Sequence, residues 1–243
     1  MNPPNPSIRI GILGPEESVT ADPRGCNLWA TGYSAVLTAA GATPVLVRDS
    51  SPRRSWAEAL EGVHGLVWTG RLGACGQAST EEERLCAWCR KTTLPVLAVD
   101  QGMHLLNSAF GGTLHTDLAR ERPEALQHRH PPEPGLRHAI SVLPGTHLSD
   151  IYGEGELVVN SEHRMGVARI ARGFRVSGQA LDGIVEAIEA DGDKWFAMGV
   201  QWRPASASAS GLDIQLFRGL MLACEHRMLT LEKTPRPACV SAA

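Results

Sequence analysis

The stretch Leu94–Leu114 reads LPVLAVDQGMHLLNSAFGGTL, and its pattern decides the fold. Its apolar first part, Pro95–Val99, is typical of a buried strand, and Gly102–Phe110 follows with the periodicity of a helix. Asp100 stands at the turn between them. A strand that passes through a sharp turn directly into a helix is the layout of a nucleophile elbow. Such a turn holds one side chain above the sheet, beside the amino terminus of the helix.

Patterns of strand and helix alternate on both sides of this stretch. The other expected strands are Ile8–Leu13, Thr43–Val47, Gly65–Trp68, Ala139–Leu143, Phe174–Ala180, Ile184–Glu189 and Trp195–Val200. The other expected helices are Leu28–Ala40, Trp56–Leu60, Thr80–Lys91, with Thr80 as its cap, and Gly211–Leu229. This alternation predicts the α/β class, with a mostly parallel central sheet covered on both faces by helices. The last strands are joined by tight turns, and Asp182-Gly183 is a strong turn signal.

Composition narrows the class of protein. The chain has 243 residues, 43% of them hydrophobic, which suits one domain over residues 1–243 with flexible ends at 1–7 and 230–243. The net charge of -3 without a basic stripe argues against a nucleic-acid partner. No apolar run approaches the roughly 20 residues that span a bilayer, and Met1–Ser7 lacks the pattern of a signal peptide. We therefore expect a cytoplasmic protein with no membrane partner; the sequence sets no oligomeric state.

Cysteines and histidines give weaker signals. The six cysteines are scattered, and Cys86 and Cys89 form a CxxC inside a helical pattern, so packing is favoured over a disulfide, redox or metal role. His128 and His130 lie in the His/Pro-rich segment His128–Gly135, which is expected to be a loop at the rim of a pocket.

The quoted stretch resembles the motif of the class I glutamine amidotransferase-like superfamily. The closest resemblance is to its γ-glutamyl hydrolase and γ-glutamyl-γ-aminobutyrate hydrolase group, known as peptidase C26. The residues that fit are Gly102, Met103, Leu105, Leu106, Asn107 and Gly111–Leu114. Further similar segments are Tyr33–Val47, Val159–His163, Ala180–Glu189 and Gly199–Pro204. The resemblance implies a flavodoxin-like three-layer fold and hydrolysis of a γ-glutamyl amide by a cysteine, a histidine and a glutamate.

The chain departs from that group where the chemistry lies. Asp100 stands at the position of the cysteine, Arg203 at that of the histidine and Ala205 at that of the glutamate. A pocket glutamine is replaced by His104, and the Gly-Gly oxyanion loop by Gly70-Arg71. An arginine cannot shuttle protons, because its pKa stays above about 12. Family-type hydrolysis is therefore not expected.

The resemblance places Asp100 and Arg203 at the former nucleophile and base positions. The residues expected to line the ligand pocket are Gly70, Arg71, Cys75, Gln101, His104, Asn160, Ser161 and His163. No cofactor is expected. No metal is expected either, because Asp100, His104 and His163 lack the spacing of a ligand set.

Two hypotheses about function follow. The first is a non-catalytic descendant of a γ-glutamyl hydrolase that binds a small amino-acid-like or amide ligand or a partner protein. The second is an enzyme of altered chemistry, in which Asp100 acts on a γ-glutamyl or other amide substrate. Asp100 is expected to sit at a strained turn with a positive φ. It is also expected to form an ion pair with Arg203, whose guanidinium can hold a carboxylate through two parallel hydrogen bonds. The alternative is that Arg203 points to solvent or pairs with another acid, while Asp100 only caps the following helix.

Overall fold

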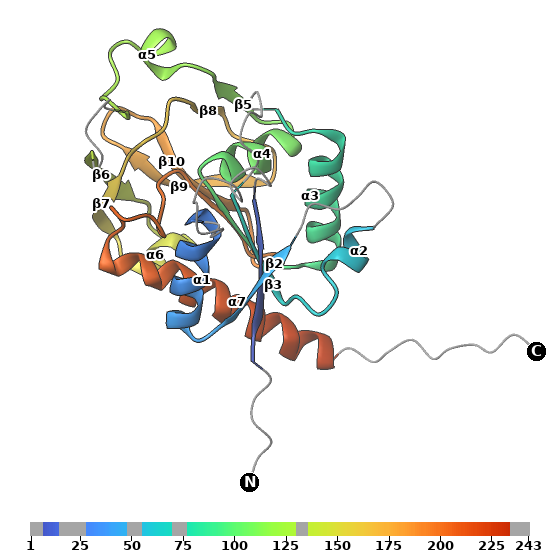
Figure 1. The fold of residues 1–243 in the computed structure, drawn as a ribbon. Helices are drawn as coiled ribbons and strands as arrows, with labels where there is room; N and C mark the ends of the chain where they lie inside the picture. Colours follow the sequence, from blue (N-terminus) through green and yellow to red (C-terminus); the bar gives the residue numbers. More distant parts are fainter. Residues whose placement is uncertain (1–6, 15–27, 48–54, 70–76, 130–135, 234–243) are drawn as a thin grey trace, which may run out of the picture.

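The computed structural model describes residues 7–14, 28–47, 55–69, 77–129 and 136–233, and all strands among them belong to one sheet (Figure 1). The strands are β1 (Arg9–Leu13), β2 (Thr43–Val47), β3 (Gly65–Trp68), β4 (Val96–Val99), β5 (Thr113–His115), β6 (Arg137–Val142), β7 (Gly155–Asn160), β8 (Gly166–Arg169), β9 (Phe174–Ala180), β10 (Val185–Ala190) and β11 (Ala197–Val200). The helices are α1 (Leu28–Ala40), α2 (Trp56–Ala59), α3 (Thr80–Thr92), α4 (Gln101–Ala109), α5 (Leu118–Glu121), α6 (His147–Tyr152), the 3-10 turn η2 (Gly211–Asp213) and α7 (Ile214–Lys233). The expected α/β class is confirmed.

The sheet has a parallel half and an antiparallel half. Its strand order is β2-β1-β3-β4-β11-β10-β9-β6-β7, with β8 pairing with β10 and β5 pairing with β8. Pairing is parallel from β2 to β11 and antiparallel from β11 onward. Since β4 and β11 are parallel neighbours with Val99 opposite Val200, the residues that follow them emerge side by side. Asp100 and Arg203 are among those residues.

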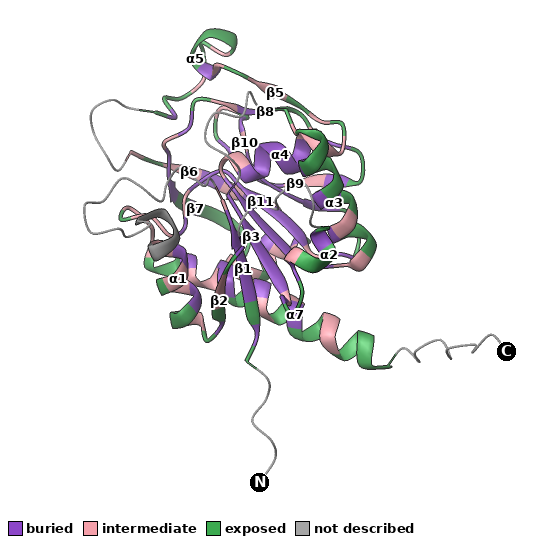
Figure 2. Ribbon diagram, turned by 45° about the vertical axis from the view of Figure 1, so that its right-hand side comes forward, coloured by how far each residue is buried: buried purple, intermediate pink, exposed green. Residues whose placement is uncertain are grey.

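Helices cover both faces of the parallel half, and its inner strands β3, β4 and β11 are buried throughout, whereas the edge strand β2 is partly exposed (Figure 2). On one face, α1 and α7 pack around Ile10, Leu37 and Phe217. On the other face, α3 and α4 pack around residues that include Leu85 and Met103. Each large apolar side chain so buried stabilises the fold by roughly 1.5–3 kcal/mol. The two cores hold in place the carboxyl ends of β4 and β11, where the candidate site lies.

The structure corrects the expected elements in several places. Ser79, not Thr80, caps α3, because its hydroxyl accepts from Glu82 N–H while the Glu82 carboxylate accepts from Ser79 N–H. The end expected to be flexible from residue 230 is helical as far as Lys233. Five short elements were not expected from the sequence, namely β5, α5, α6, β7 and β8. Three to six residues carry too little periodicity to be recognised.

Cys86 and Cys89 lie in the core between α3 and the sheet and are free thiols, in agreement with a packing role. Burial raises the pKa of the Cys89 thiol to about 12, so it stays protonated. In the part of the chain that the structure describes, none of the helices has the length and apolar character needed to cross a membrane.

Candidate functional site

Asp100 occupies a strained turn between β4 and α4. Its φ is 52° and its ψ is -111°, a region that few residues other than glycine adopt. Its N–H donates to the carbonyl of Val200 at 2.8 Å, which fixes the turn against β11. A β-carbon at Gly102 would lie 2.0 Å from the carbonyl oxygen of Trp68, so the helix can begin this close to β3 only with glycine there. The expected elbow and its positive φ are confirmed.

The side chain of Asp100 forms an ion pair with Arg203. The Nη2 and Nε groups of Arg203 donate to Asp100 Oδ2 at 2.8 and 3.0 Å. The expected pair is confirmed, but its expected geometry of two parallel hydrogen bonds is wrong, because both donors converge on one oxygen. The other oxygen, Oδ1, accepts from Gln201 Nε2 at 3.1 Å. Both oxygens of the carboxylate are thus held by donors, and neither caps α4.

Behind Asp100, Gln201 connects the ion pair to a buried histidine. The Oε1 atom of Gln201 lies 2.6 Å from His104 Nε2. Because the amide nitrogen of Gln201 donates to Asp100, its oxygen must accept, so His104 carries its proton on Nε2. Burial lowers the pKa of His104, which favours this neutral form. His104 therefore supports the ion pair indirectly.

Arg203 is held by its backbone as well as by its charge. Asn160 accepts from Arg203 N–H at 2.9 Å and donates to its carbonyl at 3.1 Å. Glu162 Oε2 lies 3.0 Å from Nη1, so the guanidinium bridges two carboxylates. Burial alone would lower the pKa of Arg203, but Asp100 and then Glu162 raise it. Burial, followed by the charge of Asp100, also raises the pKa of Tyr33.

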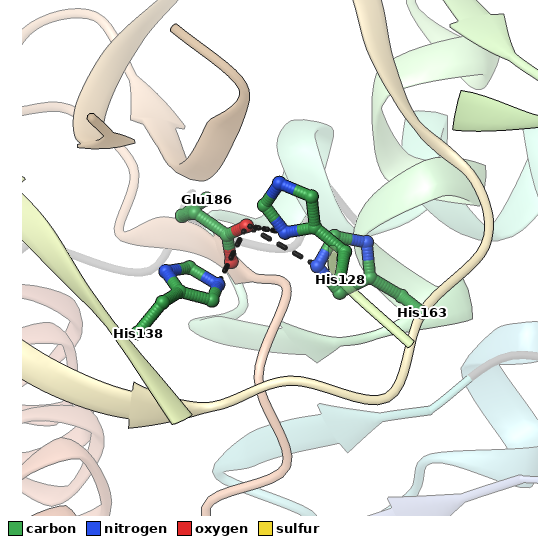
Figure 3. Close-up of side chains that lie close together, drawn as sticks. All are labelled: His128, His138, His163 and Glu186. Carbon is green, nitrogen blue, oxygen red and sulfur yellow. Dashed lines mark ion pairs between the residues drawn. The ribbon is translucent and has the colours of Figure 1, made fainter. Parts of the chain in front are cut away.

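A second group of titratable side chains is buried nearby, and we call it the histidine cluster: His128, His138, His163 and Glu186. The nitrogens His128 Nδ1 and His163 Nε2 each lie 3.2 Å from Glu186 Oε1, and His138 Nε2 lies 3.4 Å from it (Figure 3). None of these side chains is more than 8% exposed. Burial lowers the pKa of His128, but Glu186 and Asp182 outweigh it and raise the pKa overall.

The other residues expected in the pocket are placed as follows. Gln101 begins α4 and is half-buried. Ser161 is buried, and its hydroxyl donates to the carbonyl of His128 at 2.8 Å, so it holds the cluster rather than the ion pair. His128 is itself buried and does not rim a pocket, which corrects the expectation from its loop. Residues Gly70, Arg71, Cys75 and His130 lie outside the described residues, so their expected roles stay predictions.

Sequence reasoning missed four contributors to these groups: Glu162, Gln201, His138 and Glu186. Three of them lie inside the segments that carry the family resemblance, Val159–His163, Gly199–Pro204 and Ala180–Glu189. Their polar or charged side chains within those segments were the available signal. His138 gave no such signal in the sequence, because a lone histidine on a strand predicts no partner.

A large groove lies elsewhere in the described structure. It has a volume of about 790 Å³, and Pro95 and Phe196 line it together with residues of α6 and α7. Those two residues directly precede β4 and β11, whereas Asp100 and Arg203 follow these strands. The groove is therefore at the opposite end of the strands from the ion pair.

The coupling between Asp100 and Arg203 can be measured with a double-mutant cycle. Asp100→Asn and Arg203→Met are each expected to lower the free energy of unfolding by about 1–3 kcal/mol, because Arg203→Met leaves the Asp100 carboxylate without its cation and Asp100→Asn leaves Arg203 with Glu162 alone. The double change is expected to cost less than the sum of the two. The loss of free energy of unfolding would be larger for a fully buried pair. Here the Arg203 side chain is 43% exposed, so water screens part of the attraction.

Arg84 and Glu81 provide the matched control, since they form an arginine–carboxylate pair with side chains that are 67% and 53% exposed. The same cycle on this pair, Glu81→Gln with Arg84→Met, is expected to show almost no coupling. Equal coupling in the two cycles, measured by urea unfolding, would show that the pair at the elbow is no more than a surface contact.

Comparisons with known proteins match the part of the chain that contains the ion pair. The family model of Peptidase C26 matches residues 78–205, which include Asp100, Arg203 and Ala205. The chain is 36% identical over 143 residues to gamma-glutamyl-gamma-aminobutyrate hydrolase PuuD of Escherichia coli, a match that covers 56% of each protein. It is 29% identical over 217 residues to CTP synthase of Thermomicrobium roseum, covering 79% of this chain and 39% of that enzyme. The chain thus spans only about half the length of the hydrolase.

A solved structure gives the same fold. A Thermoplasma acidophilum protein, assigned as one subunit of a GMP synthase, superposes with a TM-score of 0.64. The alignment covers 94% of this chain and all of that one, at 15% sequence identity. At this identity, the likeness supports the fold alone.

Proposed function

Because this chain belongs to the Peptidase C26 family, we propose that it is a catalytically degenerate member that binds a small amino-acid-like or amide ligand, or a partner protein, without hydrolysing it. The observation that carries the proposal is the ion pair between Asp100 and Arg203. It occupies the two positions where the family resemblance places a nucleophile and its base.

The chemistry of the family needs groups that these residues do not supply. A thiolate attacks the amide carbonyl, and a histidine then protonates the leaving amine. Arg203 keeps its proton, all the more because its pKa is raised beside Asp100. Ala205 has no carboxylate to orient a base. Changes at all three positions support loss of the ancestral reaction.

Asp100 is also a poor substitute nucleophile in this arrangement. Its Oδ2 accepts two hydrogen bonds from Arg203, and its Oδ1 accepts one from Gln201. Lone pairs engaged in charge-assisted hydrogen bonds are stabilised and less available for attack. The pair therefore favours binding over covalent catalysis.

The exposed parts of the site suit a zwitterionic ligand. The side chains of Arg203 and Glu162 are 43% and 36% exposed and carry opposite charges. Among the described residues, three of the five guanidinium N–H groups donate to Asp100 and Glu162, so two remain there for a ligand carboxylate. Glu162 can in turn accept from a ligand ammonium group. An amino acid or γ-glutamyl compound offers both charges in one small molecule.

Thermal-shift and calorimetric titrations with glutamate, glutamine and γ-glutamyl-γ-aminobutyrate test this proposal. A hundredfold excess over Kd is expected to stabilise the native chain by about 2.7 kcal/mol. Arg203→Met and Glu162→Gln are each expected to abolish the shift, while the surface control Arg84→Met retains it. A shift that survives both site changes would show that the ligand binds elsewhere. If none of the compounds produces a shift, binding of these small molecules is wrong, and a partner protein remains as the proposed ligand.

The alternative is an enzyme of altered chemistry that uses Asp100 on a γ-glutamyl or other amide substrate. The retained elbow favours it, because a strained turn is costly and persists most often at functional positions. Turnover that depends on Asp100 would distinguish this alternative from the binding protein.

A further inference from the structure

The histidine cluster brings together atoms that repel one another unless a cation lies between them. Glu186 Oε1 faces three imidazole nitrogens at 3.2–3.4 Å, yet none of these contacts has the geometry of a hydrogen bond. Figure 3 shows the rings of His128, His138 and His163 directed at this carboxylate. Buried polar atoms without partners are rare in native proteins and call for a specific explanation.

The second nitrogen of each ring shows where its proton lies. His163 Nδ1 is 2.9 Å from the carbonyl oxygen of Met165, and His138 Nδ1 is 3.2 Å from that of Ala139. A carbonyl oxygen can only accept, so both Nδ1 atoms carry the proton of the neutral ring. Their Nε2 atoms therefore direct lone pairs at Glu186.

His128 is arranged in the same way, with the two nitrogens exchanged. Its Nε2 lies 2.8 Å from Asp182 Oδ2, a carboxylate that only accepts. In the neutral ring, Nδ1 is therefore unprotonated and faces Glu186 at 3.2 Å. Asp182 is itself held by Leu126 N–H and Ile184 N–H. Carboxylates and carbonyls that fix the outer nitrogen of a histidine are the usual second layer around a protein-bound metal.

We propose that His128, His138, His163 and Glu186 bind one divalent transition-metal ion, with zinc as the preferred ion. Three imidazole nitrogens and one carboxylate oxygen are ligands that zinc accepts, and four protein ligands make a closed, structural site. At bond lengths of about 2.0–2.1 Å, the edges of a zinc tetrahedron measure about 3.3 Å. The three separations from Glu186 Oε1 match this edge. All four atoms lie within 4.8 Å of one another, so small ring movements complete the tetrahedron.

Charge balance and pairing together favour a metal over added protons. Glu186 and Asp182 carry two negative charges, which one divalent ion neutralises while it contacts all three nitrogens. Protonating one or two rings would leave at least one nitrogen lone pair directed at Glu186. Protonating all three rings would bury an excess positive charge without compensation, which is unfavourable.

The ion would join segments that are distant in the sequence. His138 lies on β6 and Glu186 on β10, His163 lies between β7 and β8, and His128 follows α5. A metal held by all four would fasten the loops around the antiparallel half of the sheet. This role does not depend on what the ion pair of Asp100 and Arg203 binds.

Metal analysis of the purified full-length chain tests the proposal. After removal of metal with a chelator and reloading with zinc, the native chain is expected to retain about one ion per chain and to unfold at a higher temperature. The double variant His163→Gln/Glu186→Gln is expected to lose both effects. Cobalt(II) in the native site should give the intense visible absorption of tetrahedral coordination, which the double variant should lack.

Two further variants separate metal binding from folding. Asp182→Asn keeps an acceptor for the backbone but weakens the support of His128, and it is expected to lower zinc affinity about 10–100-fold. His115→Gln is the matched control, because His115 forms a lone histidine–carboxylate pair with Glu121 at 2.9 Å and should leave affinity unchanged. The proposal is overturned if the native chain retains no stoichiometric zinc, cobalt, nickel, manganese or iron(II). It is also overturned if Asp182→Asn, folded by circular dichroism, binds zinc as tightly as the native chain.

Discussion

Replacing Gly102 with alanine is expected to lower the free energy of unfolding by about 3 kcal/mol, at the upper end of the usual cost of overpacking. The added β-carbon would lie 2.0 Å from the carbonyl oxygen of Trp68 and 2.8 Å from its carbonyl carbon. Both are backbone atoms of the central sheet, so they cannot move aside as a flexible side chain could. Relief would require α4 to shift away from β3, and Asp100 would shift with it.

Gly211→Ala is the matched control for this change. Gly211 also begins a helical turn, but a β-carbon there meets no atom within 4 Å, and its φ needs no glycine. Its replacement is expected to be neutral or slightly stabilising, because alanine reduces the freedom of the unfolded chain. Urea unfolding of both variants measures the difference. Equal stability would mean that α4 does not pack against β3 as closely as described.

The parts of the fold that depend on local pattern could be predicted from the sequence. Leu28–Ala40, Thr43–Val47, Gly65–Trp68 and Phe174–Ala180 begin and end where expected, because each is a clear periodic or apolar run between turn residues. The elbow at Asp100 followed in the same way from a strand, a turn and a helix without a gap.

Only the part of the candidate site that the family resemblance covers could be predicted from the sequence. The resemblance placed Asp100 opposite Arg203, and their opposite charges suggested the pair that the structure contains. It could not show that Gln201 would take the second oxygen of Asp100, so that Arg203 binds only the first. That detail depends on side-chain directions at the ends of two neighbouring strands.

The histidine cluster could not be predicted, for a related reason. Its four residues are far apart in the sequence and follow no ligand spacing. They meet because β6 and β10 flank β9 in the sheet while two loops fold over them. The arrangement of strands in the sheet is a tertiary property that periodicity does not encode.

Hydrolysis of γ-glutamyl-γ-aminobutyrate by the purified chain is expected to stay at the background rate. Loss of single members of a catalytic triad lowers turnover by roughly 10⁴–10⁶-fold in a well-studied protease. Here a carboxylate held by three donors and a permanently protonated arginine stand at the first two positions. Neither can form the thioester or transfer the proton on which the family reaction depends.

The loss of hydrolysis is tested by measuring the release of γ-aminobutyrate from that substrate, by mass spectrometry, for the native chain and for Asp100→Asn. Asparagine is chosen because it tolerates a positive φ better than alanine. Both proteins are expected to release product only at the rate of buffer alone. Release by the native chain that disappears in a folded Asp100→Asn variant would contradict this expectation and establish Asp100 as a catalytic residue.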